Sequence, residues 1–468
     1  MTPSLTGPTI ARLRLAKGWS QSRLAAELCA AAGVPTLSRH EVSRWERQAR
    51  VPGAFWRGWL AVVLDAPAGR LDEAAAHARR LAVPTVRGTG ARSRAALLAL
   101  AHRFATTADT PLPMTAGPAY VPPRGVAGAP AGPRGAGDPG GAGPRGVGGP
   151  PGEVPADGPP EAALAELRRM DDLCGGVDLV GLGRARWGRA VRALTGAGPV
   201  GRRRLLPVVA ESAQLAGWLA ADAGDPEAGL DAYRLALRAA SAAGDPALAG
   251  HVLGCASHLL AGLGDPAGAL LLATAGHTGA GRRAGPGLRA LLLHRVALAA
   301  ALAGRVAAAG RALDAARRVT EEPAVEREPG WLYWLDGHEL ARLTGRTLVA
   351  LGRPRAAEML LVAGHRRGGP RDRAVYGTWL ARCHLEVGEV EQACAAAGAA
   401  LLEAIRAGSP RAVRPLAALR RRLAPHHELP AVRRYAALLA ATGPYLPRGP
   451  GAPWPGPTPG WSGASWWC

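Results

Sequence analysis

The sequence predicts an all-α protein, and three observations lead to that prediction. Apolar residues recur at intervals of three and four along the N-terminal block and again from about residue 161 to 443, as on one face of a helix. No segment shows the strict alternation that is typical of a half-buried strand. The tripeptide Gly-Asp-Pro occurs three times at a spacing of 20 residues, which fits one helix plus its turn.

The chain is strongly basic, with a formal net charge of +21 over 468 residues. Taken alone, this charge indicates a polyanionic partner, with nucleic acid first and an acidic membrane second. However, Lys occurs only at Lys17, Asn is absent, and Ile occurs only at Ile10 and Ile405. These scarce residues have AT-rich codons, so a GC-rich genome explains the composition. We therefore rely on the positions of the charges rather than on their sum.

The sequence predicts a cytoplasmic protein without a membrane span. It has no run of about 18 uncharged apolar residues, and its N-terminus has no apolar signal core. The six cysteines form no C-x-x-C pair, and none lies beside a histidine at zinc spacing. We expect free, reduced thiols and no metal site.

Composition and periodicity divide the chain into five segments. Residues 5–82 form a compact helical block, and residues 83–110 form a weakly helical extension that includes Ser93–Phe104. Gly and Pro dominate residues 111–160, which cannot bury apolar surface, so we expect a disordered linker with a span of ~40 Å. Residues 161–443 are Ala/Leu-rich and helical, and residues 444–468 form a second disordered, Pro/Gly-rich tail that ends in a Trp pair.

The N-terminal block begins with two short helices. The segment 10–17 is amphipathic, with Ile10 and Leu13 on one face, and Gly18 suits its C-terminus. Ser20 can cap the next helix, in which Leu24 and Leu28 are among the apolar positions. Two further helices, Phe55–Leu64 and Leu71–Leu81, are expected at the end of the block, and Trp59, Leu60 and Val63 would join the core.

The third helix of the block, read from Ser38 to Glu46, carries the candidate binding residues. Val42 and Trp45 have the spacing of buried positions. The outward positions are Ser38, Arg39, His40, Ser43 and Arg44. A helix fits the major groove of DNA, where Arg binds guanine bidentately and small polar side chains reach other base edges.

The pattern of these residues resembles the XRE (Cro/CI-type) helix-turn-helix family. It comprises Leu-x-x-x-x-Gly-x-Ser-Gln-x-x-Leu-Ala-x-x-Leu from Leu13 to Leu28, then Val-Ser-Arg-Trp-Glu at 42–46, then Pro52. The resemblance covers about residues 8–65 and implies a five-helix, lambda-repressor-like fold. It also implies that Gln21 opens the second helix near the DNA backbone, that Ser38–Arg44 belong to the recognition helix, and that Glu46 supports the end of that helix.

One feature of the block departs from the family pattern. The tight turn between the second and third helices is replaced by the longer stretch Cys29–Leu37, with Gly33 and Pro35 inside it. This puts the geometry of the recognition helix in doubt more than its existence. The alternative to DNA binding is a small helical domain that keeps the fold but binds protein.

The three Gly-Asp-Pro tripeptides predict helix boundaries. In Gly224-Asp225-Pro226 and in the copies that begin at Gly244 and Gly264, Gly ends one helix in the left-handed conformation. Asp caps the next helix, and Pro fits its first position. Gly304, Gly352 and Gly388 continue the register. Five residues after a register glycine stands a small residue that allows close helix packing, at Gly229, Ala269, Ala309, Ala357 and Ala393.

Residues 203–405 resemble degenerate tetratricopeptide repeats, with HEAT-like or unclassified helical hairpins as the alternative. Such repeats stack into an α-solenoid with a concave groove. The segment Trp331-Leu332-Tyr333-Trp334 is either a lining of that groove or a filling of the solenoid core. His426-His427 is taken as a surface pair rather than a metal site.

The combined layout resembles a family of actinobacterial regulators with tetratricopeptide-like C-terminal domains. The resemblance implies a sequence-specific transcriptional regulator that binds double-stranded DNA as a homodimer, with repeats that bind an effector, a partner protein or a second subunit. The alternative is a protein-interaction scaffold that does not bind DNA. No Gly-x-Ser-x-Gly, His-Glu-x-x-His or Walker A motif is present, so we expect neither an enzyme nor a cofactor.

Overall fold

The computed structural model describes residues 6–48, 50–81, 89–106, 160–322, 328–365 and 369–447. Over these residues the protein is all-α, as predicted, and none of them lies in a strand. None of the described helices is long and apolar enough to cross a membrane. The predicted disordered linker, apart from Pro160, lies outside the described residues, as does the Trp pair of the tail. The first residues of the tail, Pro444–Pro447, are described and include part of a short 3₁₀ turn.

The N-terminal block contains five helices around one core. They are α1 (Thr6–Ala16), α2 (Gln21–Ala32), α3 (Arg39–Glu46), α4 (Ala54–Val63) and α5 (Ala68–Leu81). The core contains Ile10, Leu24, Leu28, Val42, Trp45 and Leu60. Ser20 caps α2 as predicted, because its hydroxyl accepts a 3.0 Å hydrogen bond from the backbone N–H of Arg23. Trp59 and Val63 are only partly buried against this core.

The connection between α2 and α3 is shorter than the sequence suggested. Cys29 to Ala32 continue helix α2, which ends at Gly33 in the left-handed conformation (φ +67°). The Cys29 thiol then donates a 3.4 Å hydrogen bond to the carbonyl of Leu37. The connecting loop therefore runs only from residue 33 to 38, because α2 gains one more turn.

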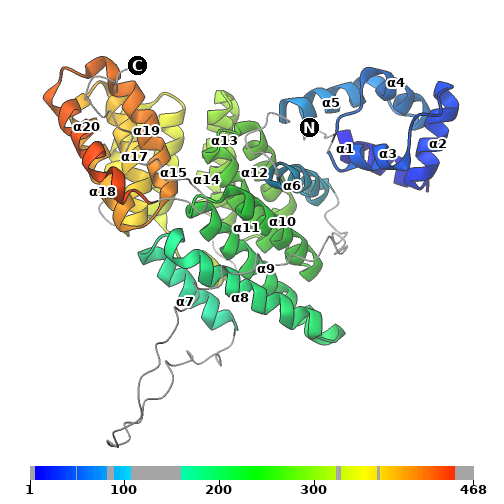
Figure 1. Cartoon of the computed structure of the whole chain (residues 1–468), viewed down its shortest axis with the longest axis horizontal. Helices are drawn as coiled ribbons and strands as arrows, with labels where there is room; N and C mark the ends of the chain where they lie inside the picture. Colours follow the sequence, from blue (N-terminus) through cyan, green and yellow to red (C-terminus); the bar gives the residue numbers. More distant parts are fainter. Residues whose placement is uncertain are drawn as a thin grey trace, which may run out of the picture.

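Helix α6 (Thr89–Thr106) includes the predicted stretch Ser93–Phe104 and packs against α10 and α12 of the repeat region (Figure 1). Leu97, Leu98 and Ala101 enter the same apolar cluster as the repeat helices. A buried ion pair also fixes α6, in which Arg94 Nε lies 2.7 Å from the Asp265 carboxylate. The N-terminal block is thus followed by a helix that belongs to the core of the repeats.

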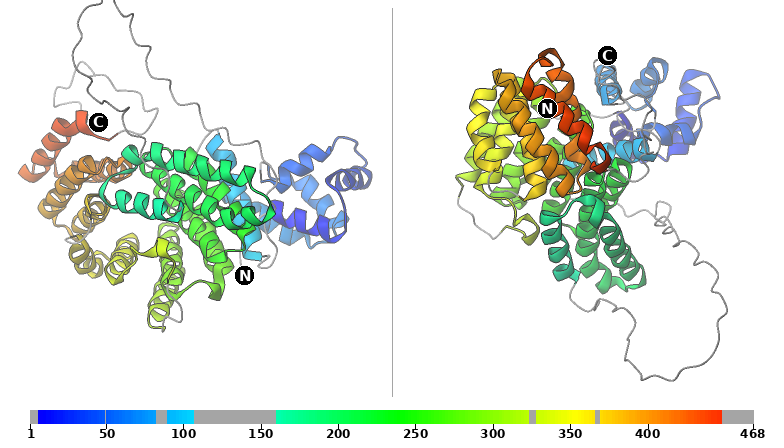
Figure 2. Two further views of the ribbon diagram at one scale, coloured as in Figure 1. Left: turned by 90° about the horizontal axis from the view of Figure 1, so that it is seen from below. Right: turned by 60° about the vertical axis from the view of Figure 1, so that its left-hand side comes forward.

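The repeat region begins at α7 and runs as successive antiparallel helices. They are α7 (Pro160–Leu173), α8 (Gly176–Gly196), α9 (Pro199–Asp222), α10 (Pro226–Ala243), α11 (Pro246–Gly262), α12 (Pro266–Ala280), α13 (Pro286–Leu302), α14 (Val306–Thr320), α15 (Gly337–Ala350), α16 (Pro354–His365), α17 (Pro370–Val387), α18 (Val390–Arg406), α19 (Pro410–Leu423) and α20 (Pro430–Thr442). Short 3₁₀ turns are present at Gly281–Arg283, Gly330–Leu332 (η2), Ala424–His426 and Gly443–Tyr445. The hairpins follow one another along a curved path (Figure 2).

The Gly-Asp-Pro turns have the predicted geometry. All three glycines are left-handed, with φ between +72° and +82°. The aspartate side chains accept hydrogen bonds of 2.8–3.0 Å from the backbone N–H three residues on, and each proline occupies the first turn of its helix. Gly304, Gly352 and Gly388 are left-handed as well. The five predicted small residues are all buried.

The first and last parts of the repeat region meet through one fully buried carboxylate. Asp222, at the end of α9, accepts a 2.8 Å hydrogen bond from the backbone N–H of Gly176. It also accepts a 2.8 Å hydrogen bond from the Ser409 hydroxyl and pairs with Arg411 of α19 at 3.2 Å. This contact between distant segments closes the curved path of the hairpins around a shared inner side.

The cysteines and the paired histidines lie as expected where they are described. Cys29, Cys174, Cys255, Cys383 and Cys394 are free thiols, and Cys468 lies outside the described residues. His426 and His427 are exposed. The part of the chain that the structure describes holds one group with metal-ligand spacing, formed by Glu358, His384 and Glu389, and it was not predicted.

Arg94→Ala tests whether the buried pair holds α6 on the repeats. The substitution leaves Asp265 buried without its partner, which costs about 3–5 kcal/mol. We expect the amides of α6 to exchange hydrogen at least about a hundredfold faster than in the unmodified chain. Arg92→Ala, at an exposed position of the same helix, is the control and should leave the exchange unchanged. Equal protection in both variants would show that apolar packing alone holds α6.

Candidate nucleic-acid interface

Helix α3 is fixed to the N-terminal block through its inward face. Val42 is fully buried, and Trp45 is 1% exposed and packs beside Trp56, with ring centroids 6.1 Å apart. Trp45 is therefore a core residue, as its spacing predicted. Burial of these two side chains determines which face of the short helix is left at the surface.

The opposite face of α3 presents the residues that the sequence singled out. Ser38, Arg39, His40 and Arg44 are exposed, and Ser43 is half-buried. Ser38 stands at the N-cap, but its hydroxyl makes no capping hydrogen bond there. The structure thus brings these five side chains together at the outer surface of one helix. Their chemistry, with two guanidiniums, an imidazole and two hydroxyls, suits base edges and phosphates.

Gln21, the sixth predicted residue, lies in a different setting. It opens α2 as expected, but its amide nitrogen donates a 2.7 Å hydrogen bond to Glu46 Oε2. The side chain is half-buried rather than exposed. Its contact with Glu46 links the start of α2 to the end of α3, which is a positioning role that the sequence alone did not indicate.

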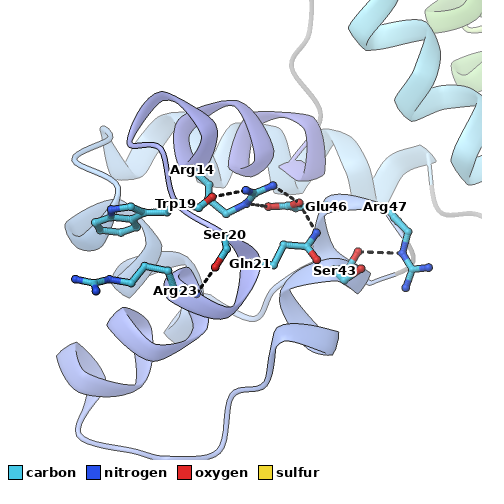
Figure 3. Close-up of polar contacts among 8 residues, drawn as sticks. All are labelled: Arg14, Trp19, Ser20, Gln21, Arg23, Ser43, Glu46 and Arg47. Atoms are coloured by element: carbon cyan, nitrogen blue, oxygen red, sulfur yellow. Dashed lines mark hydrogen bonds and ion pairs between the residues drawn. The ribbon is translucent and has the colours of Figure 1, made fainter. Parts of the chain in front are cut away.

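Glu46 is the centre of a polar network that joins three helices (Figure 3). Arg14 of α1 forms a bidentate pair with it, with Nε 2.6 Å from Oε1 and Nη2 3.0 Å from Oε2. Arg14 also donates a 2.5 Å hydrogen bond to the carbonyl of Trp19. The side chains of Arg14 and Glu46 are only 10% and 6% exposed. A buried bidentate pair is directional, so it sets the orientation of α3 against α1 and α2.

The C-terminal end of α3 also contacts the start of α1. A side chain on Gly7 would place its Cβ only 2.4 Å from the carbonyl oxygen of Trp45, so glycine is required at this crossing. Gln48 follows α3 with φ +59°. With its amide oxygen turned toward α1, Gln48 accepts hydrogen bonds of 3.1 and 2.8 Å from the N–H groups of Thr6 and Gly7.

Two further arginines beside α3 were not among the predicted residues. Arg47 is exposed at the end of the helix, and its Nε donates a 3.2 Å hydrogen bond to the carbonyl of Ser43. Arg50 is exposed and pairs at 2.8 Å with Glu41, which also pairs with Arg44 at 3.3 Å. The helical spacing of residues 40, 44 and 47 could have indicated Arg47. Arg50 follows the helix, and its return to Glu41 depends on the loop.

Glu46→Ala tests the network that positions α3. Arg14 would keep a buried charge without its carboxylate, which costs about 3–5 kcal/mol. We expect amide hydrogen exchange in α2 and α3 to rise at least about a hundredfold. Glu27→Ala removes the partner of Arg23 from an exposed pair and should change stability by at most about 0.5 kcal/mol. If the two variants behaved alike, the network would not position α3.

The chain was also compared with protein-family models, with curated proteins and with solved structures. No family model matches it, and neither a curated protein nor a solved structure does. The functional interpretation therefore depends on the sequence pattern of the N-terminal block and on the geometry of α3 and its neighbours.

Proposed function

We propose that the protein is a sequence-specific DNA-binding transcriptional regulator that acts in the cytoplasm. The observation that carries this proposal is the surface of α3, where Arg39, His40, Ser43 and Arg44 lie together on a helix whose other face is buried. A helix inserted into the major groove can direct such side chains to base edges. The block would then have the lambda-repressor-like fold that the sequence resemblance implies.

The charge of the N-terminal block supports the proposal. Residues 6–81 contain twelve Arg and Lys residues against six Asp and Glu residues. The exposed cations include Arg23, Arg47 and Arg50, which can contact phosphates. Phosphate contacts supply much of the affinity of DNA-binding proteins and position the base-reading side chains. Because this excess lies around one helix, it is more informative than the charge of the whole chain.

The repeat region would supply the regulatory input. We propose that its hairpins form a tetratricopeptide-like solenoid that binds an effector, a partner protein or a second subunit. Helix α6 would connect the regulatory region to the DNA-binding block, because it packs against α10 and α12 of the repeats and also contacts α1. Helix α5 ends at Leu81 and α6 begins at Thr89, so the interval between them in the sequence, 82–88, is short and lies outside the described residues.

Selection of duplexes from a random-sequence pool tests the DNA-binding proposal. We expect the full chain to enrich a motif, and the Arg39→Ala/Arg44→Ala variant to bind that motif at least about a hundredfold more weakly, since each base contact is worth about 1–3 kcal/mol. The control, Arg305→Ala/Arg311→Ala, removes the same charge from exposed positions of the repeat region. An unchanged motif in the α3 variant would refute the role of α3. If no motif were enriched at all, the scaffold alternative would be favoured.

The selected motif also tests the proposed homodimer. One short helix contacts too few bases for useful specificity, so we expect two inverted half-sites separated by about 10 base pairs or a multiple of that spacing. Sedimentation of the full chain on a duplex with both half-sites should show two chains per duplex. A single asymmetric site occupied by one chain would contradict the dimer.

A further inference from the structure

The repeat helices line a partly open cavity of about 130 Å³ on their shared inner side. Its wall comes from the first helix of successive hairpins, namely α9, α11, α13, α15 and α17, together with α7 and α19 from the two ends of the region. Trp331, Tyr333 and Trp334 also line it. Both expectations for the aromatic segment therefore hold in part: Trp331 and Leu332 are buried in the core and Trp334 packs against it, while Trp331, Tyr333 and Trp334 also line the cavity.

Six arginines line the cavity, and four of them are paired with carboxylates. The pairs are Arg168 with Glu211 at 2.8 Å, Arg342 with Glu339 at 2.7 Å, Arg371 with Asp171, and Arg411 with Asp222 at 3.2 Å. The two remaining acidic groups of the wall, Asp172 and Asp372, are half-buried. The Tyr333 hydroxyl donates a hydrogen bond to Asp172, and Arg342 lies 3.7 Å from Asp372.

Arg295 of α13 and Arg346 of α15 are the two arginines of the cavity wall that have no carboxylate partner among the described residues. They are only 7% and 3% exposed. No hydrogen bond or ion pair joins either of them to the residues that the structure describes, and the Nε atoms of both lack an acceptor. The guanidinium carbon of Arg346 lies 5.5 Å from the centre of the Tyr376 ring, in a cation–π contact. Glu339 is already engaged by Arg342 and by the Tyr376 hydroxyl.

The ionisation of the wall at neutral pH follows from burial. Burial lowers the pKa of Arg295 to about 10, and the positive charge of Arg346 contributes to the shift, so Arg295 remains a cation at pH 7. Burial, together with the nearby arginines, lowers the pKa of His251 to about 3 and that of His258 well below its usual value. Both histidines are therefore neutral at pH 7 and add no charge to the cavity.

Unpaired buried guanidiniums destabilise a fold unless something compensates their charge. We propose that the cavity binds a small phosphate-bearing molecule, whose phosphate group is held by Arg295 and Arg346. A guanidinium binds a phosphate through two parallel hydrogen bonds. A phosphate monoester carries close to two negative charges at pH 7, which matches two unpaired cations. A cavity of about 130 Å³ suits a phosphate group with a small substituent.

This ligand would be the effector of the regulator, and that role rests on the proposed regulatory function. Binding of the ligand to the cavity can be measured without DNA. The test uses the full chain at constant ionic strength, with inorganic phosphate, phenyl phosphate and the monoanion methyl sulfate as probes, followed by calorimetric titration. We expect both phosphates to bind and methyl sulfate to bind at least tenfold more weakly. Tighter binding of phenyl phosphate would indicate a phosphorylated organic ligand held by the aromatic wall, and equal or weaker binding would indicate free phosphate.

Arg295→Met and Arg346→Met should each weaken phosphate binding at least tenfold. Without ligand, both variants should melt at or above the temperature of the unmodified chain, because methionine removes an unpaired buried charge. The matched control is Arg289→Met, also on α13, whose arginine pairs with Glu322 at 2.7 Å; it should bind phosphate normally. The proposal is overturned if neither phosphate binds the full chain, or if both cavity variants bind as the control does.

The outcomes for the cavity and for DNA are separable. If the unmodified full chain enriched no motif in the duplex selection, the proposed regulatory function would be refuted, and the phosphate titration would still be informative. Conversely, a chain that enriches a motif but binds neither phosphate would keep its proposed function and lose this ligand assignment.

Discussion

The position of the proposed recognition helix depends on one buried carboxylate. α3 has only eight residues, so its own hydrogen bonds do little to hold it, and tertiary contacts must fix it. Glu46 meets Arg14 from α1 and Gln21 from α2 at the end of α3, while Trp45 fills the core one residue earlier. Because the network is bidentate and nearly buried, it resists rotation of α3, and the outward residues keep a fixed direction.

A second constraint determines how the N-terminal block meets the repeats. The Gly/Pro-rich segment predicted a disordered linker between the N-terminal block and the repeats. Helix α6 changes this interpretation, because it precedes that segment and is built into the repeat core through Arg94 and an apolar face. The contact between the N-terminal block and the repeat helices α10 and α12 therefore passes through α6, which precedes residue 107 in the sequence. A ligand that reorganised α10 and α12 would act on a helix that also contacts α1.

The sequence predicted the features that local chemistry determines. The caps at Ser20 and Asp225, the left-handed glycines and the inward position of Val42 each follow from a few neighbouring residues. The all-α class likewise follows from the local spacing of apolar residues. The sequence also pointed to Ser38, Arg39, His40, Ser43 and Arg44 as surface positions, since helical spacing leaves them opposite the core.

The features that escaped prediction depend on contacts between distant residues. Arg94 and Asp265 are 171 positions apart, and Asp222 and Ser409 are 187 apart. No periodicity relates such pairs, so neither the docking of α6 nor the closure of the repeats was predictable. The cavity had only one local signal, the aromatic run at 331–334. Its unpaired arginines could be recognised only after the other four had been matched with carboxylates.

Genome-wide chromatin capture of the tagged full chain in its host tests the central claim, sequence-specific DNA binding, most directly. Discrete sites that share one short motif are the predicted result, and diffuse enrichment without a motif would contradict the claim.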